Sequence, residues 1–215
     1  MQVSLTKFLL LISWVLFLVG CGAPKQLQPL SKGQVVTLSK DNFKPIFKDN
    51  FKSFLFKTTM AYGDKFEQGG MLMLKQLSEG NYRTVFMTKF GMTLFDFEFG
   101  KNGFVVHKVL KEMNKKVFLK IIEEDIEMLL ARDLLGQKAT FFEQDNPLKK
   151  QRIIKTTLNQ KTHFLVQNQH QQLTEIHKKR AVSISLSNYV TGIPRAINIQ
   201  HHNIPLSMKL LLLKH

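Results

Sequence analysis

The residues of this sequence that could do chemistry are few, and their spacing does not favour catalysis. The chain of 215 residues contains a single cysteine, Cys21, which excludes an internal disulfide framework and a cysteine-based zinc cluster. Its seven histidines include a series at intervals of seven and one adjacent pair, namely His163, His170, His177, His201 and His202. Residues at these separations lie on opposite faces of a strand, so we expect exposed polar histidines and no metal site. No nucleophile elbow, phosphate-binding loop or His-Glu-x-x-His motif is present, and the sequence predicts no enzyme and no cofactor.

The N-terminal residues have the layout of an export signal. Lys7 provides a positive flank for the mainly apolar segment Phe8–Val19. A membrane-spanning helix needs about 20 apolar residues, so this shorter segment is typical of a secretory signal peptide. The following Leu18–Cys21 resembles the bacterial lipobox, in which the cysteine sulfur accepts a diacylglyceryl group. We therefore predict removal of residues 1–20 and acylation of Cys21, with palmitate-like chains holding the protein on a membrane. An ordinary signal peptide with an incidental cysteine is the alternative.

Residues 21–40 are predicted to connect this lipid to a folded domain at residues 41–215. The segment is rich in Gln, Lys, Ser, Gly and Pro, a composition typical of a flexible tether. Residues 22–26 contain no acidic side chain. They resemble neither the aspartate signal that retains lipoproteins in the inner membrane nor the acidic signals for surface export. That resemblance implies a lipid-anchored protein of the outer membrane that faces the periplasm.

The folded domain is predicted to be mainly β with one helical insertion. Apolar and polar residues alternate in short segments such as 182–187, and such segments recur often enough for about eleven strands. Between Asn114 and Leu135 the apolar residues instead recur at helical spacing, with Gly136 as the expected C-cap. A weaker helical pattern covers Ser39–Asn50. Because several strands are apolar on both faces, we expect an incomplete antiparallel β-barrel with a greasy interior, capped by helices.

The charge of the chain is strongly basic. Lys and Arg number 31 against 16 Asp and Glu, which gives a formal net charge of +15. The basic residues are scattered, with clusters only at 149–152 and 178–180. An exported lipoprotein does not meet nucleic acid, so we expect attraction to anionic lipid or to an acidic carrier protein. The alternative is that these are ordinary solvated loop charges.

Two patches of local sequence resemble a known family. Asn81–Thr93 is similar to the stretch of the LolB outer-membrane lipoprotein receptors in which a Tyr-Arg strand enters a Leu-Gly-x-Thr hairpin. Tyr189 and Gly192–Pro194, placed before a strand at Ala196–Gln200, resemble the C-terminal part of the same family. The resemblance in layout covers most of residues 45–213. It implies the LolA/LolB fold, an unclosed antiparallel barrel capped by helices around a cavity for acyl chains.

The resemblance also assigns a membrane-insertion loop. In that family an apolar residue at the hairpin tip enters the membrane, and Lys89, Phe90, Gly91 and Met92 match that loop. This sequence departs from the pattern, since Lys89 replaces a proline and Phe90 replaces a leucine. Turns are normally polar, so an apolar tip is unusual, and its insertion into lipid would gain roughly 1.5–3 kcal/mol. The alternative is that Phe90 folds back into the core.

The function that the resemblance implies is lipoprotein transfer without covalent catalysis. A LolA-like periplasmic carrier would hand over lipoproteins, whose acyl chains enter the cavity before insertion into the inner leaflet of the outer membrane. The predicted acyl-cavity lining consists of Phe54, Phe56, Leu72, Leu74, Val85, Phe86, Phe95, Phe97, Phe118, Ile122 and Ile126. We expect a monomer. The alternatives are a structural or interaction lipoprotein of the same fold, or a carrier of other envelope lipids.

Overall fold

The computed structural model describes most of the predicted folded domain. The described residues are 33–47, 51–100, 103–131, 134–146, 149–158, 160–178 and 181–214. The predicted signal peptide and Cys21 lie outside them. Within these ranges, no helix combines the length and the apolar character needed to cross a bilayer.

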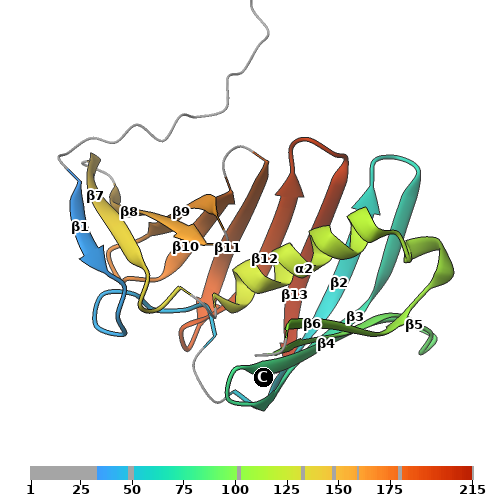
Figure 1. Ribbon diagram of the computed structural model, residues 1–215. Coiled ribbons are helices and arrows are strands. Elements are labelled where there is room, and N and C mark those ends of the chain that lie inside the picture. Colours follow the sequence, from blue (N-terminus) through green and yellow to red (C-terminus); the bar gives the residue numbers. More distant parts are fainter. Residues whose placement is uncertain are drawn as a thin grey trace, which may run out of the picture.

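A single antiparallel sheet of 13 strands makes up most of the described structure (Figure 1). In chain order the strands are β1 (Gln34–Thr37), β2 (Ser53–Tyr62), β3 (Phe66–Ser78), β4 (Asn81–Thr88), β5 (Thr93–Gly100), β6 (Gly103–Val109), β7 (Lys138–Asn146), β8 (Lys149–Leu158), β9 (Lys161–Gln167), β10 (Leu173–Lys178), β11 (Val182–Val190), β12 (Ile193–His201) and β13 (Leu206–Lys214). Their order across the sheet is β1-β7-β8-β9-β10-β11-β12-β13-β2-β3-β4-β5-β6. Most neighbours along the chain therefore pair as hairpins, and β13 joins the two halves by pairing with β2.

The sheet curls without closing, so β1 and β6 form its two edges. Figure 1 shows α2 (Lys116–Leu130) lying across the curled sheet, with β4–β6 folded beneath it. This arrangement confirms the predicted incomplete antiparallel barrel with a helical insertion. The additional strand is β1, which lies inside the segment assigned to the tether and pairs with β7 in the register Gln34↔Phe141. The folded part of the chain therefore begins by residue 34.

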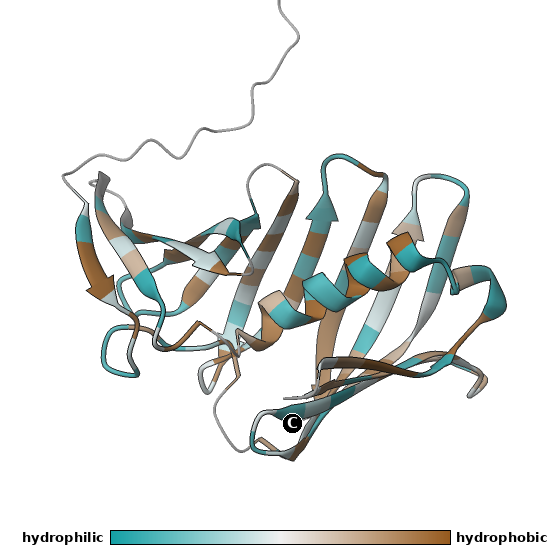
Figure 2. Cartoon of the chain, in the orientation of Figure 1, coloured by the Kyte–Doolittle hydropathy of each residue, from teal (hydrophilic) through white to brown (hydrophobic). Residues whose placement is uncertain are grey.

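Alternation of side chains decides which face of each strand is buried. In β2, Phe54, Phe56 and Met60 are buried while Lys57 between them is exposed. The same alternation appears as brown and teal bands along the strands in Figure 2. The buried side chains of all the long strands join the inward face of α2 in one hydrophobic core. Burial of these apolar side chains, at about 25 cal/mol per Å², is the main driving force for the curled shape.

The helical predictions are correct in kind but not in their bounds. A short 3₁₀ turn, η1 (Lys111–Met113), precedes α2, which begins at Lys116 rather than Asn114. The helix ends at Leu130, where Ala131 takes the left-handed conformation with φ 49°. The predicted C-cap at Gly136 is therefore wrong, and the Gly136 N–H donates instead to the Leu38 carbonyl. Residues 39–47 form turns in place of the weaker predicted helix, and residues 48–50 lie outside the described ranges.

Candidate functional site

Aromatic side chains fill the concave face of the sheet. Phe95 and Phe97 stack with ring centroids 4.6 Å apart, and Phe86 packs against Phe95 at 5.5 Å. Phe47 contacts Phe54 at 4.8 Å in a second group. None of these five side chains is more than 4% exposed. The interior is therefore close-packed as well as apolar.

Most of the predicted cavity-lining residues belong to this interior. The buried members are Phe54, Phe56, Leu72, Leu74, Phe86, Phe95, Phe97, Ile122 and Ile126, each at most 3% exposed. They pack against one another, so the space that they enclose is filled by the protein's own side chains. Phe118 is only partly buried against this core. The assignment of Val85 is wrong, because it pairs with Met73 and Asp96 on the outer face of the sheet.

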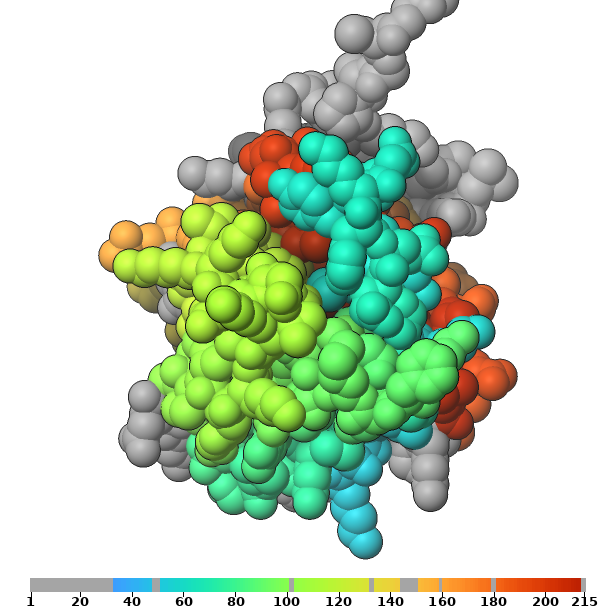
Figure 3. All heavy atoms as spheres, turned by 90° about the vertical axis from the view of Figure 1, so that its right-hand side faces the viewer, coloured from blue at the N-terminus to red at the C-terminus, as the bar shows by residue number. Residues whose placement is uncertain are grey.

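The helix α2 covers this interior with one apolar face. Ile122, Ile126 and Leu129 point into the core and are at most 2% exposed, whereas Val117 at the start of the helix is 73% exposed. Figure 3 shows the surface hollowed between the yellow-green residues of α2 and the cyan β2–β3 hairpin. The helix takes no part in the strand pairing, so the hydrogen-bond ladders of the sheet do not depend on its position.

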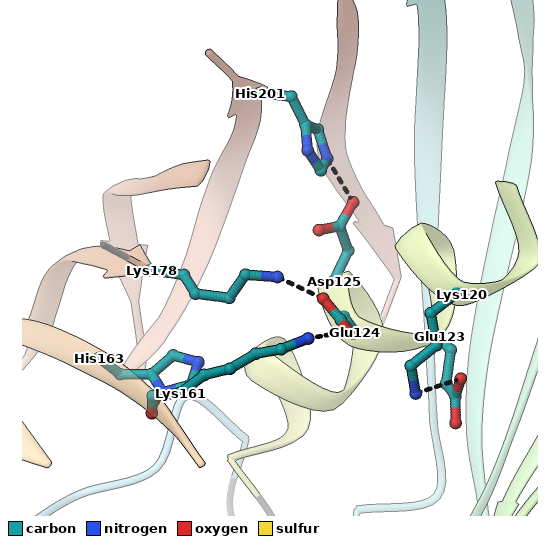
Figure 4. A network of polar contacts seen from close by, with 8 residues as sticks. All are labelled: Lys120, Glu123, Glu124, Asp125, Lys161, His163, Lys178 and His201. Carbon is teal, nitrogen blue, oxygen red and sulfur yellow. Dashed lines mark hydrogen bonds and ion pairs between the residues drawn. The ribbon is translucent and has the colours of Figure 1, made fainter. Parts of the chain in front are cut away.

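Charged contacts fasten one side of α2 to the sheet (Figure 4). The Lys161 Nζ and Lys178 Nζ groups each donate to one carboxylate oxygen of Glu124. The neighbouring Asp125 accepts from His201, with 2.9 Å between Oδ2 and Nε2. We call these five residues, Glu124, Asp125, Lys161, Lys178 and His201, the helix clamp. The clamp connects α2 to β9, β10 and β12, and it leaves the other side of the helix held by apolar contacts.

The two acids of the clamp have opposite electrostatic environments. Burial raises the pKa of Asp125, which is 1% exposed, and the hydrogen bond from His201 only partly opposes this. Burial also acts to raise the pKa of Glu124, but the two ammonium groups outweigh it, so that this pKa lies below its ordinary value. Asp125 Oδ1 has no hydrogen-bond partner within the described part of the chain. The buried Asp125 is thus the electrostatically strained member of the clamp.

Sequence reasoning missed the clamp. Exposed histidines were expected, but His201 is 8% exposed and His163 is 5% exposed, and burial lowers the pKa of His163. His163 Nδ1 lies 2.9 Å from the Lys161 carbonyl oxygen. The available signal was Asp125 itself, which stands in line with Ile122 and Ile126 on the apolar side of the helix. Within the described ranges, no group of three or more metal-ligating side chains is gathered.

The stability contributed by Asp125 is expected to depend on pH. A pKa raised above the ordinary 3.8 means that stability is complete below that value and is lost as the pH rises through the raised pKa. Asp125→Asn removes this loss. The difference in unfolding temperature, variant minus parent, is therefore expected to increase as the pH rises. Thermal unfolding followed by circular dichroism over a pH series measures this difference.

Glu124→Gln is the matched control for that series. Because the pKa of Glu124 is lowered, its contribution is present above the ordinary 4.5 and is lost as the pH falls through the lowered value. The difference in unfolding temperature, variant minus parent, is therefore expected to decrease as the pH rises. Differences that stay constant with pH in both variants would contradict the electrostatic assignment.

One cavity lies beside α2, and a second lies near the end of the sheet formed by the turns of β9–β10 and β11–β12. The smaller, about 200 Å³, is lined by Glu124, Lys161 and Lys178 of the clamp and by Lys120, Glu127, His163, Met128 and Leu158, so that charged and apolar groups share its wall. The larger, about 470 Å³, lies between residues 40–46, Leu135 and the turns of β9–β10 and β11–β12. The apolar side chains of its wall are Phe43, Pro45, Ile46, Leu135 and Leu173. Lys40, Lys44 and His170 also line it, so its chemistry suits an amphiphile with an anionic group.

The β4–β5 hairpin presents its tip away from the core. Phe90 is 99% exposed and Met92 is 51% exposed. The turn is fixed by hydrogen bonds from the Gly91 N–H to the Thr88 carbonyl at 3.0 Å and from the Thr88 N–H to the Met92 carbonyl at 2.8 Å. Gly91 has a φ of 82°, a conformation that glycine adopts without strain. The alternative in which Phe90 packs into the core is therefore wrong for this structure.

Comparisons with known proteins identify the fold. No family model matches the sequence, and no curated protein is similar to it at a significant level. Among solved structures, a LolA-superfamily protein from Nitrosomonas europaea matches with a TM-score of 0.55 and 9% identity, covering 81% of this chain and 87% of that one. An outer-membrane lipoprotein-sorting protein domain from Vibrio parahaemolyticus matches with a TM-score of 0.49 and 5% identity, over 77% of this chain and 85% of that one. The curled sheet with its covering helix is therefore a LolA-like fold.

Proposed function

We propose that this protein binds the acyl chains of lipoproteins between α2 and the concave face of the sheet. In this proposal it receives its cargo from a LolA-like periplasmic carrier and inserts it into the outer membrane, to which Cys21 anchors it. The observation that carries the proposal is an apolar interior covered by a helix that charged residues fasten at one side. The LolA-like fold supports it further. No step requires a catalytic residue.

The closed interior is consistent with binding that requires the helix to move. Displacing α2 exposes Ile122, Ile126 and Leu129, and this apolar surface must be covered again. An acyl chain can cover it, since each buried CH₂ contributes about 0.8 kcal/mol. The acyl chain thus passes from one apolar environment to another. Transfer then requires only that the affinity for the acyl chain increases stepwise from carrier to receptor to bilayer. We infer that the helix clamp sets how often α2 opens.

The exposed hairpin tip supports contact with the membrane. A phenylalanine moved from water into lipid gains roughly 1.5–3 kcal/mol. Lys89 beside it adds about 1 kcal/mol of attraction to anionic headgroups. The turn hydrogen bonds fix the backbone that carries Phe90 outward, so the backbone of the tip loses little conformational freedom on insertion. We propose that the segment Lys89–Met92 delivers the cargo to the bilayer surface.

Uptake of an acyl probe tests the interior site. We expect a fluorescent fatty acid to bind the full-length protein saturably, with an affinity on the order of micromolar, and to be displaced by palmitate. The rate of uptake is expected to level off at high probe concentration, because opening of α2 then limits it. Stopped-flow fluorescence measures this rate, and mass spectrometry of the purified protein detects copurified lipid.

Two variants of α2 provide the controls for uptake. Val117→Glu lies on the exposed side of the helix and leaves uptake unchanged, whereas Ile126→Glu places a charge beneath it and abolishes uptake. Circular dichroism verifies that both variants are folded. A protein that is consistently empty and takes up no probe would refute the interior site.

The close packing of the interior supports a second candidate function. A structural or interaction lipoprotein would use the same fold with its interior permanently filled by the phenylalanine side chains of the concave face. It would tolerate changes at the hairpin tip and would not take up acyl probes. A carrier of other envelope lipids would take up the probe without moving lipoproteins. Mislocalisation of other lipoproteins after depletion of this protein distinguishes that case from the receptor.

A further inference from the structure

Several strands carry apolar side chains on both faces. One face packs into the core, but the core does not explain the apolar side chains on the other face. In Met71–Leu74, the side chains of Leu72 and Leu74 point into the core, whereas Met71 and Met73 point outward and are partly exposed. In β13, Leu210 is buried and Leu211 is 50% exposed. The helix α2 covers the opposite, concave face of the sheet (Figure 1). The outward apolar side chains therefore need an explanation of their own.

These outward side chains form a continuous band because the strands place them in register. One row crosses four strands as Leu211, Lys57, Met71 and Met87. The adjacent row contains Leu55, Met73 and Val85. We call the six apolar members, Leu55, Met71, Met73, Val85, Met87 and Leu211, the outer apolar band. An antiparallel sheet with one face in water normally carries polar residues at these positions, and a contiguous apolar surface is typical of an interaction site.

The charges around the band identify the chemistry of its partner. Lys57 lies within the first row, and Lys75 and Lys209 occupy outward positions beside it. All three lysines are exposed. The nearest outward acid, Asp96, is bonded to Arg83 at 2.7 Å, so that this pair is neutral as a whole. A partner that presents both apolar and anionic groups matches this pattern.

The band is also continuous with the exposed hairpin tip. Met87 is the penultimate residue of β4, and Lys89 and Phe90 follow the end of that strand after Thr88. Its cross-strand partner Met71 continues the same surface onto β3. The apolar surface therefore runs from the residue that is proposed to enter the membrane to the centre of the sheet.

A bilayer fits this surface better than a second copy of the chain. In a two-fold dimer formed through the band, Lys57 would be buried against the apolar side chains of the other copy. The cores of protein interfaces are depleted in lysine for this reason. At a bilayer, the ammonium group of Lys57 reaches the headgroups while its aliphatic part stays on apolar surface. Methionines adapt their shape to such an irregular environment.

We propose that the outer apolar band rests on an anionic lipid bilayer, so that the membrane contact extends from the hairpin tip across the convex face of β13, β2, β3 and β4. The proposal rests on the proposed membrane role of that tip. It orients the molecule on its membrane, with the convex face toward the lipid and the covered interior away from it.

A tryptophan reporter tests this orientation. The single tryptophan, Trp14, lies in the predicted signal peptide, so that Met73→Trp supplies the only tryptophan of a processed chain. The processed chain, from which residues 1–20 have been removed, is reconstituted into vesicles of an equimolar mixture of phosphatidylglycerol and phosphatidylcholine with brominated acyl chains. We expect the emission of the reporter to shift to the blue and to lose most of its intensity to bromine quenching. Gln200→Trp is the control, because Gln200 is exposed on the outer face of β12, outside the band.

Charge reversal decides whether the lysines contribute. Lys57→Glu together with Lys209→Glu is expected to reduce quenching of the Met73→Trp reporter to the level of the control, as is replacement of the anionic lipid by phosphatidylcholine. If brominated lipid does not quench the emission of the Met73→Trp reporter, the proposal is overturned. A blue shift that depends on protein concentration without vesicles also overturns it, since that would identify a second copy as the partner. If quenching is lost while uptake of the acyl probe is normal, only the membrane contact of the outer apolar band is overturned. If uptake is absent while quenching is normal, only the proposed acyl-chain site beneath α2 is overturned.

Discussion

Covalent closure of the helix clamp is expected to weaken the uptake of acyl chains strongly. A carbodiimide converts a carboxylate and an amine in contact into an amide, and Glu124 is in contact with both Lys161 and Lys178. The bond would fix α2 on the sheet and remove the open state. Because apparent affinity scales with the populated fraction of the binding-competent state, we expect uptake to weaken by roughly tenfold or more. Titration with the fluorescent fatty acid measures it, and peptide mass spectrometry locates the bond.

Glu124→Gln is the matched control for that experiment. The variant lacks the carboxylate that forms the bond, so the same treatment leaves its uptake intact. Without treatment, it is expected to take up the probe faster than the parent, since two ion pairs that hold the helix are lost. A crosslinked protein that binds the probe as well as the untreated one would show that the acyl chain does not enter beneath α2.

Phe90→Glu is expected to block transfer of cargo into membranes while leaving the fold intact. The side chain is 99% exposed, so its replacement should change the stability by no more than about 0.5 kcal/mol. Insertion of the tip loses roughly 1.5–3 kcal/mol, which corresponds to a factor of about 10 to 150 in the equilibrium for membrane contact. Transfer of an acylated lipoprotein from carrier to vesicles, followed by flotation, measures the effect.

Two substitutions control for charge and for size. Val117→Glu introduces the same charge at another exposed apolar residue, at the start of α2, which is 73% exposed, and transfer should be unaffected. Phe90→Leu keeps an apolar tip and is expected to retain most of the activity. If Phe90→Glu transfers cargo as efficiently as the parent, the structural or interaction role becomes the better account of this protein.

The sequence predicted the elements well because each depends on local alternation. Segments that alternate with period two, such as Val182–Leu186, became strands, and the helical spacing of Ile122 and Ile126 became α2. Alternation separates the two faces of a strand but does not say which face is inward. Val85 was for this reason placed inside, although its neighbours Thr84 and Phe86 are the buried residues.

What the sequence did not predict depends on contacts between distant segments. Asp125 and His201 are 76 residues apart, and only the curling of the sheet brings them together. The short strand β1 is stabilised by its pairing with β7, and it lies within a segment, residues 21–40, whose overall composition resembles a linker. The filling of the interior likewise follows from how side chains of many strands pack, and hydrophobic pattern alone does not distinguish a filled interior from an open one.

Because β1 and β6 are the two edges of the sheet and do not pair with each other, the circumference of this barrel is not fixed by strand pairing. In a closed barrel the number of strands and their stagger determine the diameter, so the lumen has one size. Here the gap between the two edges can widen or narrow by small changes in twist at every strand, with each ladder of hydrogen bonds kept. Under the proposed function, a barrel of variable circumference would accept cargoes that differ in the number and length of their hydrocarbon tails.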